Sequence, residues 1–289
     1  EPFTARARLD LEAIAALVPV AVRMLDDVLT VTRWPLPQQA AEAAAKRRIG
    51  LGLTGLGDAL IMLGQRYDSA SARETAAAIA ERLRDAAYAA SIALAREKGT
   101  FPLCDPEALL ATPFIGRLPQ PLRDGIARHG LRNSHLLSIA PTGTISLAFA
   151  DNLSSGIEPA YAWSYRRNRR MADGNMRGYR VEDHAHRMYR ARFGRDAPLT
   201  DAFVSALEIG PRAHMAMVAA LTPYIDAGIS KTINVPADEP LSAFRDLYLD
   251  AWRLGLKALS TFRPSSGRAS VLSAGDDVCE CRLVSETGA

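Results

Sequence analysis

The sequence has little cysteine, no long apolar run and almost no net charge, and each shortage excludes a class of protein. Its 289 residues include three cysteines, Cys104, Cys279 and Cys281, which are too few for a disulfide framework and favour a reducing, cytoplasmic location. No apolar run reaches the ~18 residues of a membrane-spanning helix, and the N-terminus lacks the order of a signal peptide. The 35 basic and 32 acidic residues leave a formal charge of +3, which argues against nucleic-acid binding driven by overall charge.

The histidines form no metal-binding pattern. His184 and His186 are two residues apart, and side chains at this spacing point away from each other on a helix. The five histidines lie at positions 129, 135, 184, 186 and 214. We therefore predict no metal site.

The cysteine pair near the C-terminus allows more than one interpretation. Cys279 and Cys281 are separated by a single residue, and two cysteines cannot complete a zinc site. The pair is a redox shuttle between a site and an external reductant, half of a metal site, or two inert thiols. We favour redox as the functional interpretation.

Helical periodicity dominates residues 1–130. The helices that we expect cover residues 10–32, 37–48, 71–98 and 122–129, and a further one begins near residue 50. Pro19 predicts a kink in the first of them. Ser71 and Glu74 have the spacing of a capping box, which places the start of the long alanine-rich helix at this serine.

Residues 131–263 change to an alternating α/β pattern. Short apolar runs predict strands at residues 136–140, 232–235 and 260–263, with helices at 181–192, 211–220 and 241–256. Residues 264–289 are polar and contain Gly and Ser, so we predict a flexible tail. The chain is thus expected to have an α/β fold with a mainly helical N-terminal part.

The segment from Gly50 to Gly55 (GLGLTG) matches the dinucleotide-binding fingerprint by letters. That fingerprint needs a strand directly upstream, and the residues there are polar and helical in pattern. We favour instead glycines that let a helix pack closely against its neighbours through Leu51, Leu53, Leu56 and Leu60.

The turn after residues 136–140 is the strongest candidate site. It contains Pro141, Thr142, Gly143, Thr144, Ile145 and Ser146. Gly143 would let the backbone approach an anion, and the hydroxyls of Thr142, Thr144 and Ser146 are potential donors. The turn lacks the lysine of a Walker loop, so an anion cradle and an ordinary turn both remain open.

Two further features lie downstream of this turn. Glu158 follows within a loop (SSGIEP), where it is either a wall of the same pocket, together with Ser146, or an exposed carboxylate. Residues 166–170 (RRNRR) carry four positive charges in five residues. They could attract phosphates, but a solvated face is the favoured interpretation.

Four segments together resemble the C-terminal half of the large subunit of ribonucleotide reductase, most of all the adenosylcobalamin-dependent class II enzymes. They are residues 47–58 (RRIGLGLTGLGD), 133–146 (NSHLLSIAPTGTIS), 154–159 (SSGIEP) and 230–236 (SKTINVP). The match runs in order from about Phe3 to Arg263. It implies a ten-stranded α/β barrel, of which residues 1–263 would form the second half, and a phosphate-binding role for residues 141–145.

The resemblance also implies radical chemistry, but some of the residues that this chemistry requires in the family are absent from the sequence. In the family, adenosylcobalamin generates a cysteine thiyl radical that initiates reduction of the ribose, and a cysteine pair supplies electrons. The finger loop with its Asn-x-Cys-x-Glu pattern is absent, and Ala258 and Leu259 stand where Gly-Cys is expected. Cys279 and Cys281 match at most the shuttle thiols that a thioredoxin-like reductant would reduce.

Two hypotheses follow for the function of the chain. It is part of a ribonucleotide reductase that acts on a ribonucleotide when the N-terminal half of the barrel is supplied. The first residue is Glu1 rather than Met, so we expect a processed product or a piece of something longer. Alternatively, it is a catalytically silent module that binds nucleotide phosphates or has a regulatory role.

Overall fold

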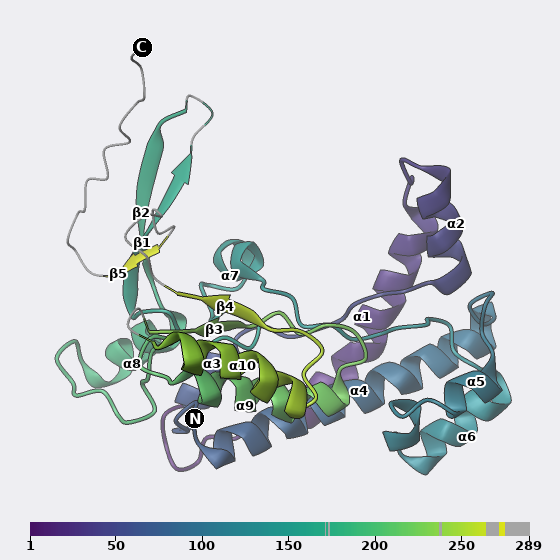
Figure 1. Ribbon diagram of the computed structural model, residues 1–289, viewed down its shortest axis with the longest axis horizontal. Helices are drawn as coiled ribbons and strands as arrows, with labels where there is room; N and C mark the ends of the chain where they lie inside the picture. Colours follow the sequence, from purple (N-terminus) through teal and green to yellow (C-terminus); the bar gives the residue numbers. More distant parts are fainter. Residues whose placement is uncertain (171, 173, 237–238, 264–271, 275–289) are drawn as a thin grey trace.

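The fold is α/β, with helices gathered at one end, short parallel strands near the middle and an antiparallel hairpin at the other end (Figure 1). The computed structural model describes residues 1–170, 172, 174–236, 239–263 and 272–274. Cys279 and Cys281 lie outside these residues, as does the predicted tail apart from residues 272–274. Among the described helices, none is long and apolar enough to cross a membrane.

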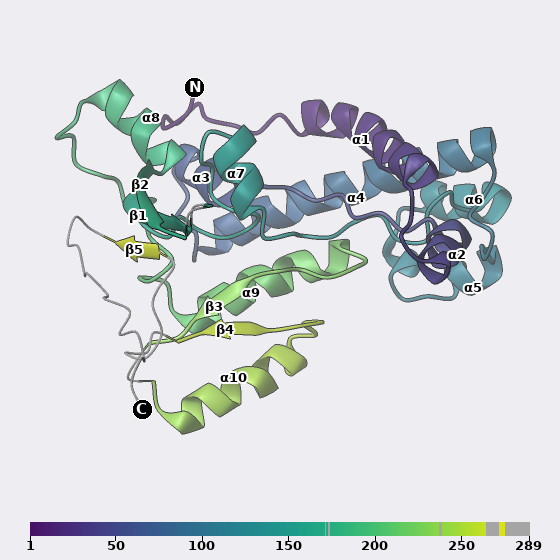
Figure 2. The same cartoon turned by 90° about the horizontal axis from the view of Figure 1, so that it is seen from above.

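The N-terminal part is built on two long helices that lie side by side, α1 and α4 (Figure 2). Val18 and Val22 of α1 are buried against the alanine-rich face of α4. Shorter helices pack around this pair. The elements are α1 (Leu11–Val31), α2 (Pro37–Lys46), α3 (Leu56–Met62), α4 (Ala70–Lys98), α5 (Pro106–Leu110), the 3₁₀ turn η1 (Ile115–Arg117) and α6 (Gln120–His129).

Several expected helix starts differ from the structure. Helix α4 begins one residue before Ser71, because the Ser69 hydroxyl accepts a hydrogen bond from Ala72 N at 3.1 Å and so caps the helix. The helix expected near residue 50 begins only at Leu56. Residues 49–51 are instead extended, because they hydrogen-bond along residues 135–138. Helix α1 continues through Pro19 to Val31.

Four extended segments lie side by side in parallel and form the β part of the fold. Residues 136–139 occupy an inner position: Leu51 N donates to Leu136 O at 2.8 Å on one side, and Ile139 N donates to Gly228 O at 3.0 Å on the other. Strands β3 (Thr232–Asn234) and β4 (Ser260–Phe262) extend the arrangement. The spatial order of the segments is therefore 49–51, 136–139, 228–234 and 260–262.

Helices α9 and α10 bury apolar side chains against β3. Met215, Ile233 and Leu247 form one small core from α9, β3 and α10. The remaining elements are α7 (Gly143–Phe149), α8 (His184–Phe193), α9 (Pro211–Leu221), η2 (Thr222–Tyr224) and α10 (Leu241–Arg253). Helix α8 starts at His184 rather than at 181, because residues 181–182 belong to a strand and Asp183 caps the helix.

A hairpin that the sequence analysis missed projects from the β end of the molecule (Figure 1). Strands β1 (Ser164–Arg170) and β2 (Met176–Glu182) pair antiparallel, and β5 (Leu272–Ala274) pairs with β1 on its other side. The basic run at residues 166–170 therefore lies in a strand. Its arginines and asparagine lack the apolar alternation by which strands are recognised.

Candidate functional site

The candidate turn lies at the end of the inner segment 136–139 and opens α7. Thr142 adopts a left-handed conformation with φ 55°, and Gly143 begins the helix. The first helical hydrogen bond is that of Ser146 N to Thr142 O, at 2.8 Å. In the described part of the chain, the N–H groups of Gly143, Thr144 and Ile145 find no acceptor. Three donors thus converge at one helix start, which suits an anion.

Gly143 leaves open space beside these donors. A Cβ built on it would have Ser155 Oγ as its nearest neighbour, at 3.9 Å, which is an ordinary contact. Pro141, Thr144 and Ile145 are exposed. Access to the backbone is therefore what the glycine provides, since packing does not require it.

Two of the three hydroxyls of the turn form hydrogen bonds within the protein and do not face the open space beside Gly143. Thr142 Oγ1 accepts from Gly156 N at 2.7 Å and lies 2.8 Å from Thr54 Oγ1. Ser146 Oγ donates to Leu153 O. Of the three hydroxyls considered from the sequence, that of Thr144 alone makes no hydrogen bond with the described residues.

Glu158 is an ion-pair partner and not a free carboxylate. Its Oε2 accepts from Lys231 Nζ, and its Oε1 accepts from Thr232 N at 2.6 Å. The Lys231 side chain is buried, and it also donates to His214 Nδ1 at 2.9 Å and to Thr232 O at 2.8 Å. The ammonium thus uses all three of its protons and ties the 154–159 loop to the start of β3.

His214 completes this buried cluster as a neutral ring. Since Lys231 donates to Nδ1, the ring proton is assigned to Nε2, which donates to Ala206 O at 3.0 Å. Burial, and then the neighbouring ammonium, lower the pKa of His214 from 6.5 to about 4. The cluster therefore holds one positive and one negative charge.

The depressed pKa of His214 predicts a loss of stability in acid. Between pH 6.5 and about 4 the unfolded chain binds a proton at His214 that the folded chain excludes, so His214 lowers the free energy of unfolding as pH falls through this window. The pKa difference corresponds to on the order of 3 kcal/mol. Urea unfolding at pH 7, 5.5 and 4.5 measures it. Relative to the unsubstituted chain, His214→Gln should gain stability as pH falls, whereas His129→Gln, at an exposed position, should not; the same pH trend in both variants would contradict the assignment.

A second buried cluster, which the sequence analysis missed, joins α3 to α8. Asp58 is fully buried and Asp183 nearly so, and each carboxyl group affects the pKa of the other, so the two interact. Burial, and then the Asp183 charge, raise the pKa of Asp58 to about 8. Asp58 Oδ1 has no hydrogen-bond partner among the described residues. Because the raised pKa keeps a proton on this pair at neutral pH, we infer that the two carboxyl groups share it.

The glycines of residues 50–57 allow close approach, as we favoured from the sequence. A Cβ on Gly52 would lie 2.2 Å from Ser138 O, and one on Gly57 would lie 2.7 Å from Glu158 O. Both obstacles are backbone atoms. The glycines therefore let residues 49–53 and the start of α3 contact residues 138 and 158 directly.

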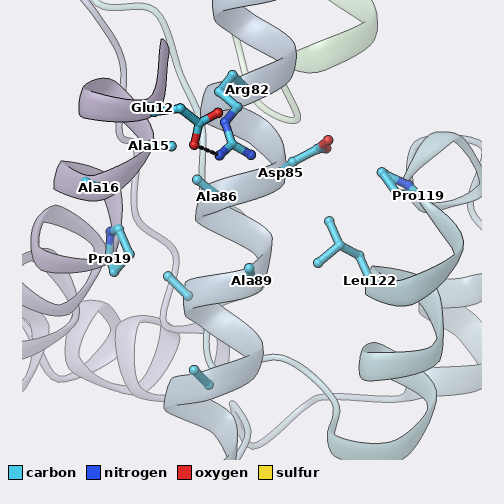
Figure 3. Close-up of a pocket in the computed structure, with 12 residues that line it drawn as sticks. Glu12, Ala15, Ala16, Pro19, Arg82, Asp85, Ala86, Ala89, Pro119 and Leu122 are labelled. Carbon is cyan, nitrogen blue, oxygen red and sulfur yellow. Dashed lines mark hydrogen bonds and ion pairs between the residues drawn. The ribbon is translucent and has the colours of Figure 1, made fainter. Parts of the chain in front are cut away.

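The cavity in Figure 3 is a groove between α1, α4 and α6 with a volume of 620 Å³. Alanine methyl groups and Pro19 form most of its lining, and the Glu12–Arg82 ion pair spans it. None of its lining residues belongs to the turn or to the two buried clusters. In the described part of the chain, no group of three or more His, Cys, Asp or Glu side chains could hold a metal ion.

Comparison of the sequence with known families identifies the family of the chain. The sequence model of the ribonucleotide reductase barrel domain matches residues 2–262, so the chain belongs to that family. It is 34% identical to the vitamin B12-dependent ribonucleoside-diphosphate reductase of Mycobacterium tuberculosis, over 93% of this chain and 39% of the relative. The corresponding enzyme of Thermoplasma acidophilum is 29% identical, over 93% of this chain and 35% of its own length.

A relative with a different name is also similar. The ribonucleoside-diphosphate reductase subunit alpha of Treponema pallidum is 28% identical, over 89% of this chain and 29% of its own length. The chain therefore spans less than two fifths of these relatives. The resemblance drawn from the four motifs is confirmed at the level of the family.

Proposed function

We propose that this chain forms the C-terminal part of the catalytic barrel of a vitamin B12-dependent ribonucleotide reductase, and that residues 141–145 hold the phosphates of the ribonucleotide. The observation that carries the proposal is the set of unpaired N–H groups of Gly143, Thr144 and Ile145 at the start of α7. They stand at the end of a buried parallel segment, within a motif that matches the family.

The four parallel segments would form part of a ten-stranded barrel. They run in one direction, and helices α3, α7 and α10 follow the first three of them, which suits one side of a closed α/β barrel. The other strands would come from an N-terminal half. Helix α7 supports this idea, because Phe149 is 85% exposed and Ile145 53% exposed. Large apolar side chains of this kind favour burial against a partner.

In the complete enzyme the two halves of the barrel would have different roles. The turn would bind and orient the substrate, and the N-terminal half would contribute the radical cysteine and its carboxylate. A thioredoxin-like reductant would supply the electrons, and Cys279 and Cys281 are candidate thiols to carry them to the site. Adenosylcobalamin would supply the initiating radical when bound.

We assign no cobalamin-binding residues to this chain. The groove in Figure 3 does not suit a corrinoid with its polar amide side chains, because alanine and proline form most of its lining. We therefore do not place the cofactor in this groove, and the proposal for the phosphate turn does not depend on it.

Calorimetric titration with inorganic pyrophosphate tests the phosphate site. Gly143→Val should weaken binding about tenfold or more, because its side chain occupies the space through which an anion approaches the N–H groups. The substitution meets no close neighbour, so the fold should tolerate it. Gly116→Val, which also has open space around its Cβ position, serves as the matched control and should bind normally. Unchanged affinity in Gly143→Val would overturn the proposal.

A catalytically silent phosphate-binding module remains the second candidate. The gene sequence upstream of Glu1 distinguishes the two. A reading frame that continues into such a pattern supports the reductase, and a start codon directly before Glu1 supports the module.

A further inference from the structure

We propose that Thr54, in the glycine-rich segment, is a positioning residue that holds the phosphate turn in its anion-binding shape. The inference rests on the proposed function of residues 141–145 and concerns how that site is kept in place. It depends on three contacts between elements far apart in the sequence, at residues 54, 142 and 154–156.

Thr142 in the turn adopts a backbone conformation that is unfavourable for threonine. Thr142 is β-branched and has φ 55°, in the left-handed region that β-branched side chains seldom adopt. A relaxed Thr142 would return to negative φ. Because Gly143, Thr144 and Ile145 follow directly, such a change would turn their N–H groups away from their common direction. Some interaction must therefore hold Thr142.

The protons of the hydroxyl network can be assigned. Thr54 Oγ1 donates its only proton to Ser154 O at 3.1 Å. The proton between the two threonine hydroxyls, which lie 2.8 Å apart, must then come from Thr142. Gly156 N donates to both oxygens, at 2.7 Å to Thr142 and 3.1 Å to Thr54. The chain of donors thus runs from Gly156 through Thr142 and Thr54 to Ser154.

This order makes Thr54 the link between the turn and the rigid part of the fold. The segment that carries Thr54 is anchored on both sides of it. Leu51 N hydrogen-bonds to Leu136 O, and Gly55 N donates to Ser154 O at 2.8 Å. The Thr142 hydroxyl has thereby a fixed acceptor, and its proton is not available to a ligand. The role of Thr142 is to fix the backbone, and the backbone N–H groups are left to bind the phosphate.

Thr54→Val tests the assignment, because it keeps the shape of the side chain and removes the hydroxyl. We expect the variant of the full chain to bind inorganic pyrophosphate about tenfold more weakly, the effect of about one hydrogen bond. Thr54→Ser should bind as the unsubstituted chain does, because it restores the hydroxyl. Thr222→Val is the matched control. It also removes a threonine hydroxyl, but this hydroxyl donates to Val218 O at 2.8 Å and lies outside the turn.

A spectroscopic readout separates positioning from a general loss of stability. The three-bond HN–Hα coupling constant of Thr142 reports its φ angle, and it should change in Thr54→Val but not in Thr222→Val. If Thr54→Val binds pyrophosphate normally while Gly143→Val does not, the role of Thr54 is overturned and the phosphate site stands. If the unsubstituted chain fails to bind pyrophosphate, both proposals are overturned.

Discussion

Replacing Lys231 with methionine is expected to lower the free energy of unfolding by about 3–5 kcal/mol. The Lys231 side chain is 1% exposed and donates to Glu158, His214 and Thr232. Methionine fills a similar volume but leaves the Glu158 charge without its counterion and the His214 Nδ1 atom without a donor. Urea unfolding at pH 7 measures the loss.

A double variant identifies the source of this loss. Lys231→Met combined with Glu158→Gln removes both charges, so it should recover a large part of the stability that the single variant loses. Glu42→Gln, which breaks an exposed ion pair to Lys46 on the surface of α2, should change the stability by less than about 1 kcal/mol. A loss of less than ~1 kcal/mol in Lys231→Met, or a double variant as unstable as the single one, would contradict the structural role of the cluster.

Replacing Asp58 with asparagine is expected to stabilise the chain at alkaline pH. The folded pKa of Asp58, about 8, lies above the ordinary value of 3.8, so the folded chain keeps a proton that the unfolded chain releases. The stability that this proton provides is fully present below pH 3.8 and is lost as pH rises towards 8. Asparagine is neutral throughout, so its amide can donate to Asp183 at every pH.

The expected difference between this variant and the unsubstituted chain is large. Relative to the unsubstituted chain, Asp58→Asn should gain on the order of 5 kcal/mol between pH 4 and pH 8. Denaturant unfolding across this range measures the gain. Asp196→Asn, at an exposed position, is the control and should show no such trend. A stability difference that does not change with pH would show that no proton is shared between Asp58 and Asp183.

The two buried clusters have opposite pH dependences. His214 lowers the free energy of unfolding as pH falls from 6.5 to about 4, and Asp58 lowers it as pH rises from 3.8 to about 8, because burial disfavours the charged form of each group. The differences between each variant and the unsubstituted chain separate the two effects.

Periodicity predicted the long elements well because their burial is local in the sequence. Helix α1 (Leu11–Val31) and helix α9 (Pro211–Leu221) match their expected ranges within about a residue. The expected strand at residues 136–140 is extended in part, and its Leu136, Leu137 and Ile139 are buried. The hairpin of β1 and β2 was missed because its strands are polar and basic. The start of α4 was misplaced because Ser69 and Ser71 are both plausible caps, and only the backbone conformation of Ser69 distinguishes them.

The sequence by itself determined the family, the α/β character of residues 131–263 and the location of the candidate turn, because short motifs and local apolar patterns encode all three. Only the tertiary structure decided how the turn is built. Its Thr142 hydroxyl is held by Thr54, 88 residues away, and Glu158 is paired with Lys231, 73 residues away. Buried polar groups must find partners wherever the fold brings them, and spacing along the chain does not reveal those partners.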